Sequence, residues 1–363
     1  MDAIAVGGGL AGTAFALKLA GTGAKVMIIE RTPGPHHKVC GDFLSGEARA
    51  LLQHLDIDLA PLGGNPIRTL GLSDRAAEVK APLPFEAIGL SRFRLDETLL
   101  EAAAQRGIVV VRGATVEALE DLGGEVVVRT THSTYRAKAA ALASGKHNIR
   151  GIARPSGPMV GFKLHLAPTN TARASLQGLV RLIAFPGGYA GACLVENGTL
   201  SIAWNIESKV LNAVGTSWRE QSAHIARASP LFGELARDAD PLWTKPLAIS
   251  GLPYGFLRTA TISPAIYPIG DQLAVIPSFA GDGTSLALAS GIAAAQAMLN
   301  NEDARAFQHR LVARHRGQFR LVRALDRVIA RPLLRRAAIT LARYAPNIVT
   351  RLAGATRLNT LEI

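Results

Sequence analysis

Glycines near the start of the chain constrain its fold more than any other feature. Gly7, Gly9 and Gly12 fit the pattern G-x-G-x-x-G, with the apolar run 3–6 before them and the helix-favouring segment 13–20 after them. A strand, a glycine turn and a helix in this order predict a unit that binds a dinucleotide. The alternative is a glycine-rich turn without a ligand.

Each glycine has its own physical task in such a unit. Gly7 permits the tight turn, Gly9 lets the backbone approach a pyrophosphate, and Gly12 lets the helix pack closely against the strand. The helix N-terminus, with Leu10 and Ala11, offers free N–H groups and a positive dipole to the phosphates. We therefore expect these five residues to form the phosphate-binding turn.

A second apolar run, at 25–29, ends in an acidic residue. Two continuous apolar strands around a helix are typical of a buried parallel sheet. Glu30 follows Gly12 by 18 residues, the position from which a carboxylate accepts hydrogen bonds from the adenosine ribose. The carboxylate of Glu30 disfavours the 2′-phosphate that distinguishes NADP. The adjacent Arg31 could accommodate that phosphate, so NADP stays a candidate ligand.

A second ligand-shaped segment lies near the far end of the chain. Gly270 and Asp271 are followed by Gly281, Gly283 and Thr284, where a helix is expected to begin. Asp271 can accept a hydrogen bond from a polyol, and the N–H groups of Gly283 and Thr284 can face an electron-rich carbonyl. A flavin with its ribityl chain needs both features, so FAD is favoured over a nicotinamide cofactor. An Asx turn before a glycine-capped helix is the plain structural alternative.

In the middle of the chain, short apolar runs alternate with Gly and Asn turns, which predicts an antiparallel sheet over residues 160–206. We expect this sheet to form the wall of a substrate pocket. His165 is open to two interpretations, an acid or base, or a solvated histidine on the strand face. No Ser/His/Asp set and no metal cluster is found in the sequence. The candidate lining residues are Phe162, His165, Phe185, Tyr189 and Trp204, together with Cys40.

Three motifs in this order resemble the para-hydroxybenzoate hydroxylase-type FAD-dependent oxidoreductases. They are the N-terminal glycine pattern, Arg92 with Asp96, and Gly270-Asp271 with the glycines that follow, and the likeness covers residues 3–299. The resemblance implies an α/β fold: a Rossmann-like FAD-binding domain, an interleaved antiparallel β-sheet substrate domain and a C-terminal helical tail. The expected segments are FAD-binding 1–75, substrate lobe 76–90, FAD-binding 91–155, β-sheet substrate domain 156–260, FAD-binding 261–302 and an Arg-rich helical segment 303–363.

Two further segments are similar to the geranylgeranyl reductase branch of that superfamily. Residues 38–45 read Lys-Val-Cys-Gly-Asp-Phe-Leu-Ser, and residues 184–191 read Ala-Phe-Pro-Gly-Gly-Tyr-Ala-Gly. Aromatic-ring hydroxylase-like enzymes carry similar segments. The resemblance implies that Cys40 and Gly41 lie near the isoalloxazine, where Cys40 either packs as a small apolar residue or modulates the flavin. It also implies that Arg92 braces FAD, with a surface arginine as the alternative.

The chain departs from the superfamily at two points. An Asp-Gly pair is usual near mid-chain, where it contacts NAD(P)H and flavin, but residues 143–146 here read Ala-Ser-Gly-Lys. This departure weakens the expectation of NADH or NADPH as the transient electron donor. The halogenase motif Trp-x-Trp-x-Ile-Pro is also missing, because Trp204 stands alone.

Charge is concentrated in the C-terminal tail. The net charge is +12, and residues 305–357 hold 13 Arg, no Lys and one acid, which leaves 27 basic and 27 acidic residues elsewhere. This distribution does not favour nucleic-acid binding. Two interpretations are open. In the first, the tail is attracted to an anionic membrane, or to a thioester or pyrophosphate carrier. In the second, it is a solvated cap helix without a partner. The arginines expected on one side of a helix are Arg316, Arg320, Arg323, Arg327, Arg331 and Arg335.

The remaining features predict a cytoplasmic protein, with the tail as a peripheral membrane contact. Two cysteines give no disulfide framework, no apolar run is long enough to span a membrane, and residues 1–3 leave no room for a signal peptide. The leading functional hypothesis is an FAD-dependent monooxygenase that hydroxylates an apolar or aromatic small molecule with O2. The alternatives are geranylgeranyl reductase-like reduction of isoprenoid or polyene double bonds, and a non-enzymatic flavin-binding sensor or partner module.

Overall fold

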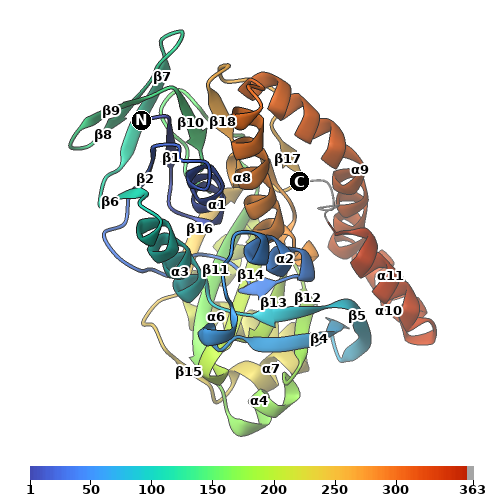
Figure 1. Ribbon diagram of the computed structural model, residues 1–363. Coiled ribbons are helices and arrows are strands. Elements are labelled where there is room, and N and C mark those ends of the chain that lie inside the picture. Colours follow the sequence, from blue (N-terminus) through green and yellow to red (C-terminus); the bar gives the residue numbers. More distant parts are fainter. Residues whose placement is uncertain (358–363) are drawn as a thin grey trace.

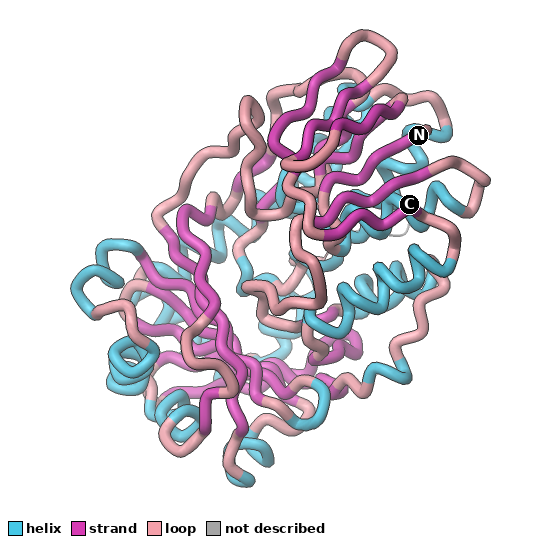
Figure 2. Tube along the Cα trace, turned by 90° about the vertical axis from the view of Figure 1, so that its left-hand side faces the viewer, coloured by secondary structure: helices cyan, strands magenta, loops and turns pink. Residues whose placement is uncertain are grey.

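The structure is a computed structural model that describes residues 1–357. It contains a five-stranded parallel sheet, a nine-stranded mixed sheet and a set of C-terminal helices (Figure 1). Figure 2 shows the two sheets as separate groups of strands joined by loops. The expected fold class, a Rossmann-like α/β domain with a second β-sheet domain, is confirmed.

The parallel sheet contains the N-terminal strand at its centre. Residues of β1 alternate between two cores, because Ala3 and Ala5 pack under helices while Ile4 and Val6 pack on the other face. All four are buried, which explains why the strand is apolar throughout. The strand order is β18 (Ile266–Pro268), β10 (Ala139–Leu142), β1 (Ala3–Val6), β2 (Val26–Glu30) and β6 (Val109–Arg112).

Helices cover one face of this sheet and a small β-meander covers the other. The meander is formed by β7 (Val116–Asp121), β8 (Val126–Thr130) and β9 (Thr134–Ala137). A Cβ on Gly291 of α8 would overlap the carbonyl oxygen of Ala11 in α1, so this glycine permits the two helices to lie in close contact. The helices are α1 (Leu10–Ala20), α2 (Gly46–His54), α3 (Arg92–Gln105) and α8 (Gly283–Leu299).

The large sheet has one helix-covered face, formed around Trp204, and one face turned toward the parallel-sheet domain. Four of its strands pair antiparallel as expected, but β4 and β12 pair parallel, so the sheet is mixed. The order is β15 (Asp240–Pro241), β11 (Met159–Ala167), β14 (Leu200–Glu207), β13 (Gly188–Leu194), β12 (Leu179–Phe185), β4 (Asn65–Asp74), β5 (Ala77–Gly89) and β3 (Phe43–Leu44), with β16 (Leu247–Leu252) on β11.

The division into domains stays a prediction, but the strands do not follow its first boundary. β4 and β3 fall in the expected FAD-binding segment 1–75, yet both belong to the large sheet. Four helices within the expected β-sheet segment 156–260 are not foreseen in the sequence. They are α4 (Asn170–Ser175), α5 (Ser208–Val214), α6 (Trp218–Ala228) and α7 (Pro230–Ala236).

Three helices follow the FAD-binding segments, as expected: α9 (Ala304–Ala330), α10 (Pro332–Tyr344) and α11 (Pro346–Ala355). The predicted arginine stripe is wrong beyond Arg327, because Arg331 lies between α9 and α10. Arg335 is buried and ion-paired with Asp74 at 3.1 Å. The end of the expected tail, 358–363, lies outside the described residues. No helix among residues 1–357 has the length and apolar character needed to cross a bilayer.

Candidate cofactor and substrate site

A cavity of about 660 Å³ lies between the two sheets and is bordered by both glycine segments. Residues from the first strand–helix turn and from the start of α8 meet here, although more than 260 residues separate them in the chain. Of the predicted cofactor-binding residues, Gly12 does not line the cavity. Those that do are Gly7, Gly9, Leu10, Ala11, Glu30, Arg31, Cys40, Gly41, Arg92, Gly270, Asp271, Gly281, Gly283 and Thr284.

The three N-terminal glycines differ in what requires them. Gly7 has a φ of +112°, and a Cβ there would overlap the carbonyl oxygen of Ala143. A Cβ on Gly12 would overlap the carbonyl oxygen of Gly7. Gly9 has ordinary extended backbone, and a Cβ there would lie 3.5 Å from Lys38 Nζ. A larger residue at this position would therefore fit the protein itself in the absence of a ligand. The protein's own packing therefore requires Gly7 and Gly12, whereas Gly9 keeps open a space beside a cation.

Two cations and one carboxylate stand beside Gly9. Asp96 binds Arg92 Nε at 2.6 Å through Oδ1 and Lys38 Nζ at 2.7 Å through Oδ2. Burial opposes the charge of Arg92, but Asp96 outweighs burial and raises the pKa of Arg92 above its ordinary value. The group carries one net positive charge at the helix N-terminus, an arrangement that suits a diphosphate.

Glu30 is buried at the end of β2 and accepts three hydrogen bonds from the chain. Gly8 N donates at 2.8 Å to Oε2, and Thr32 N and Thr32 Oγ1 donate at 3.0 and 2.7 Å to Oε1. Burial alone would raise the pKa of Glu30, but the charge of Lys38 and these donors outweigh it and lower the pKa. Glu30 therefore stays ionised at neutral pH, and it lines the cavity with capacity to accept a further hydrogen bond.

The second glycine segment borders the same cavity, and its first residue, Gly270, lies beside Ala11 of the first segment. Gly281 has a φ of +72°, and a Cβ on Gly283 would meet nothing within 4 Å. Asp282, the N-cap of α8, is fully buried and ion-paired with Arg357 at 2.7 Å. Lys146, which stands in the segment where the superfamily usually has an acid, lies 3.4 Å from Asp271.

These features fit FAD bound at full length. One cavity offers a positively charged diphosphate position at Gly9, a carboxylate for a ribose at Glu30, and an open helix N-terminus at Gly283. The two glycine segments thus border one site. Individual contacts between these residues and FAD stay predictions.

The predicted wall residues are divided between the two faces of the large sheet. Phe162 and Trp204 line the cavity, but their rings stack on each other at 5.2 Å and pack in the helix-covered core. Phe185 does not line the cavity, because its ring packs edge-on against His224 of α6. Tyr189 lies beside the cavity, where its hydroxyl group is 2.6 Å from Ser278 Oγ.

Ser278 joins a small cluster of neutral polar groups at the cavity wall. Asn205 Nδ2 donates to Ser278 Oγ at 2.8 Å, and the Tyr254 hydroxyl group donates to Asn205 Oδ1 at 2.7 Å. Burial raises the pKa of Tyr189 to about 12 and the pKa of Tyr254 well above its ordinary value, so both phenols stay protonated. The cluster can hydrogen-bond a polar group of a substrate without carrying charge.

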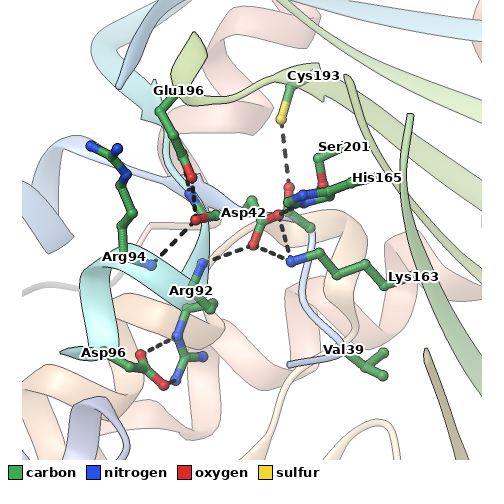
Figure 3. Close-up of polar contacts among 12 residues, drawn as sticks. Val39, Asp42, Arg92, Arg94, Asp96, Lys163, His165, Cys193, Glu196 and Ser201 are labelled. Atoms are coloured by element: carbon green, nitrogen blue, oxygen red, sulfur yellow. Dashed lines mark hydrogen bonds and ion pairs between the residues drawn. The ribbon is translucent and has the colours of Figure 1, made fainter. Parts of the chain in front are cut away.

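Sequence reasoning missed a buried ionic cluster behind the cavity, centred on Asp42 (Figure 3). Its carboxylate accepts hydrogen bonds from Lys163 Nζ at 2.7 Å, His165 Nε2 at 2.8 Å, Ser201 Oγ at 2.8 Å and Arg92 N at 3.2 Å. Burial alone would raise the pKa of Asp42, but Lys163 and His165 outweigh it and hold the pKa well below its ordinary range. The interpretation of His165 as a solvated residue is therefore wrong.

The cluster anchors the segment that borders the cavity at Cys40 and Gly41. Asp42 follows them directly and has a φ of +54°, a backbone conformation that its hydrogen bonds hold in place. Cys193 Sγ donates to Gly41 O at 3.5 Å. A signal was present in the sequence, because Lys163 and His165 occupy the same face of an otherwise apolar strand.

Similarity to curated proteins extends over most of the chain. The menaquinone reductase of Mycolicibacterium smegmatis is 26% identical over 319 residues, 82% of this chain and 76% of that protein. The menaquinone reductase of Mycobacterium tuberculosis H37Rv is 25% identical over 351 residues, 91% of this chain and 84% of that protein. No family model matches the chain.

Solved structures share the fold. A flavoprotein/dehydrogenase from Cytophaga hutchinsonii has a TM-score of 0.77 and 19% identity, covering 90% of this chain and 87% of that chain. The flavin-dependent brominase Bmp2 has a TM-score of 0.78 and 16% identity, covering 98% and 93%. The halogenase PltM in complex with phloroglucinol and FAD has a TM-score of 0.72 and 16% identity, covering 91% and 75%.

Proposed function

We propose that this chain, an enzyme of the FAD-dependent oxidoreductase superfamily, reduces a carbon–carbon double bond of an apolar isoprenoid substrate of the menaquinone class. The observation that carries the proposal is its likeness to menaquinone reductases over 82–91% of its length. This likeness favours reduction over the hydroxylation that leads the expectations from sequence. The halogenase-like structures support the fold alone, because their identity to this chain is 16%.

The cavity wall supports an apolar substrate. Part of its aliphatic lining comes from β16 and from the segment that contains β19 (Ala274–Val275). The neutral cluster of Asn205, Tyr254 and Ser278 borders the same cavity and offers hydrogen bonds without an ionised group. In these two segments the lining residues with larger aliphatic side chains, called the aliphatic wall below, are Leu247, Ile249, Leu252, Val275 and Ile276.

The chain's own residues bind, orient and exclude water, while bound FAD, once reduced by the electron donor, would supply the hydride. Each reduced double bond takes up two electrons and two protons, and NADH or NADPH is the proposed source of the electrons. Lys38 and Arg92 would hold the diphosphate, and Glu30 would hold the adenosine ribose. The aliphatic wall excludes water from the double bond, and the neutral polar cluster orients a polar head group such as a quinone carbonyl.

The test is an anaerobic turnover assay with purified enzyme, FAD, dithionite and a menaquinone with an unsaturated side chain. After any quinol has been reoxidised to the quinone, mass spectrometry is expected to show a product heavier by two hydrogens for each reduced side-chain bond, with no oxygen incorporated. The same assay with NADH and with NADPH identifies the donor. Product that forms only in air and contains one oxygen atom from O2 would favour the monooxygenase and overturn the proposal.

A further inference from the structure

The last two helices expose an apolar surface, which we call the tail face. It consists of Leu333, Leu334, Leu341, Tyr344, Ile348 and Leu352. Leu333 is 78% exposed and Tyr344 is 87% exposed. These six side chains are half of the twelve large apolar side chains that are exposed among the described residues. Such a concentration within twenty residues marks an interaction surface rather than scattered surface apolarity.

Helix α10 is apolar on two opposite sides. One side carries Ile339 and Ala342, which pack against Val79 and Ala81 of β5. At 100° per residue, Leu333, Leu341 and Tyr344 fall on the opposite side. The second apolar side has no partner among the described residues, and a helix of this kind in water lowers its free energy by covering that side.

Positive charge surrounds the tail face. Residues 327–357 contain seven arginines and no acidic residue. Arg335 and Arg357 are ion-paired with Asp74 and Asp282, but Arg343 and Arg351 are exposed. Arg343 lies between the two apolar sides of α10, next to Tyr344 in the chain, and Arg351 lies one residue before Leu352. An apolar strip with an arginine rim is the pattern of a helix that lies in a lipid interface.

We propose that the tail face binds the surface of an anionic lipid bilayer, with the leucines and Tyr344 inserted between head groups and the arginines against phosphates. A second copy of the chain is a poorer occupant, because a two-fold contact would bring the arginine rims against each other. A free pyrophosphate carrier needs the arginines but not the exposed leucines. The proposal does not depend on the reaction catalysed.

Helix α11 holds the tail face in place on the body of the protein. Thr350 Oγ1 donates to Pro82 O at 2.8 Å, and Val349 packs with Val79 and Ala81 of β5. Beyond it, Arg357 reaches Asp282 at the start of α8. The docking surface is therefore joined to the large sheet at β5 and to the start of α8, contacts that would orient the cavity with respect to the bilayer.

The test is co-sedimentation of the full-length protein with vesicles of phosphatidylcholine alone or of phosphatidylcholine with phosphatidylglycerol. Binding is expected only with phosphatidylglycerol and is expected to weaken at high salt. The double variant Leu341→Gln/Tyr344→Gln is expected to bind at least tenfold more weakly. Arg343→Glu/Arg351→Glu is expected to lose more than tenfold, since each arginine near an anionic surface contributes about fivefold.

Matched controls carry the same chemical changes away from the tail face. Leu122→Gln alters an exposed leucine between β7 and β8, and Arg219→Glu alters an exposed arginine on α6. Both are expected to bind like the wild type. Equal binding to both vesicle types, or no binding, would overturn the proposal. The proposal would also be overturned if the protein forms a dimer that Leu341→Gln dissociates. It would likewise be overturned if the protein binds inorganic pyrophosphate but does not bind vesicles.

Discussion

The ammonium group of Lys163 lies 2.6 Å from the carboxylate of Asp42, and neither side chain is exposed to solvent. Lys163 belongs to the large sheet, whereas Asp42 belongs to the segment that borders the cofactor cavity. The pair therefore joins the large sheet to the segment that borders the cavity. A buried pair of this kind is not a strong source of net stability, but breaking it leaves an uncompensated charge.

Replacing one partner of this pair is expected to destabilise the protein strongly. Lys163→Met leaves the Asp42 carboxylate buried without its cation, which costs about 3–5 kcal/mol in the free energy of unfolding. Urea denaturation measures the loss. Ser201→Ala is the matched control, because it removes one neutral donor to the same carboxylate and costs about 1 kcal/mol. Equal losses in the two variants would contradict the role of Lys163.

A second carboxylate gives the protein a distinct pH dependence. Burial raises the pKa of Asp282 to about 7 against the opposing charge of Arg357. Between about pH 4 and pH 7 the folded state keeps a proton that the unfolded chain releases, so stability falls as pH rises through this interval. Relative to Asp282→Asn, the wild type is expected to lose about 1.4 kcal/mol per pH unit there and to stay level above it.

Denaturation of both proteins at several pH values checks this prediction. Arg357→Met removes the opposing cation, so the pKa of Asp282 is expected to rise further and the decline to continue above pH 7. Parallel curves for the wild type and Asp282→Asn across the whole interval would contradict the assignment.

The aliphatic wall is expected to contact substrate rather than FAD. Ile249 is partly exposed on β16 and lines the cavity, so Ile249→Gln is tolerated by the fold. The polar amide is expected to raise KM for an isoprenoid substrate at least tenfold, because it must lose its water against an apolar chain. FAD affinity, measured by fluorescence titration, is expected to stay unchanged. A loss of FAD affinity with unaltered KM would show that this wall contacts the flavin and not the substrate, which would contradict the prediction.

Local patterns in the sequence predicted the fold well where they reflect burial. The apolar runs that became β1, β2 and β10 are buried on both faces, so their composition reports the parallel sheet directly. The parallel pairing of β4 with β12 was not predictable in this way. It joins segments more than 100 residues apart, and no periodicity within either strand specifies its partner.

The same distinction applies to the site. The glycine segments were recognisable because a turn and a helix start impose local requirements, and they do border one cavity. The Asp42 cluster was not recognisable in the sequence. Lys163 and His165 on a strand look like surface residues until their partner carboxylate, more than 120 residues away in the chain, is known. Phe185 was misjudged for a related reason, since the sequence does not reveal which face of the sheet the helices cover.

The account rests on one claim, that Gly9 and Gly283 border the two ends of a single FAD molecule. The most direct measurement is the stoichiometry and affinity of FAD for the wild type, Gly9→Val and Gly283→Val, followed by flavin absorbance. The wild type is expected to bind one FAD per chain. Both variants, which the protein alone accommodates, are expected to keep their stability and lose at least a hundredfold in affinity.

Gly34→Val is the control, because Gly34 also has open space around it but does not line the cavity. It is expected to bind FAD like the wild type. If the wild type takes up no flavin, or if Gly9→Val and Gly283→Val bind FAD as tightly as Gly34→Val does, the two glycine segments do not hold one cofactor and the account is contradicted.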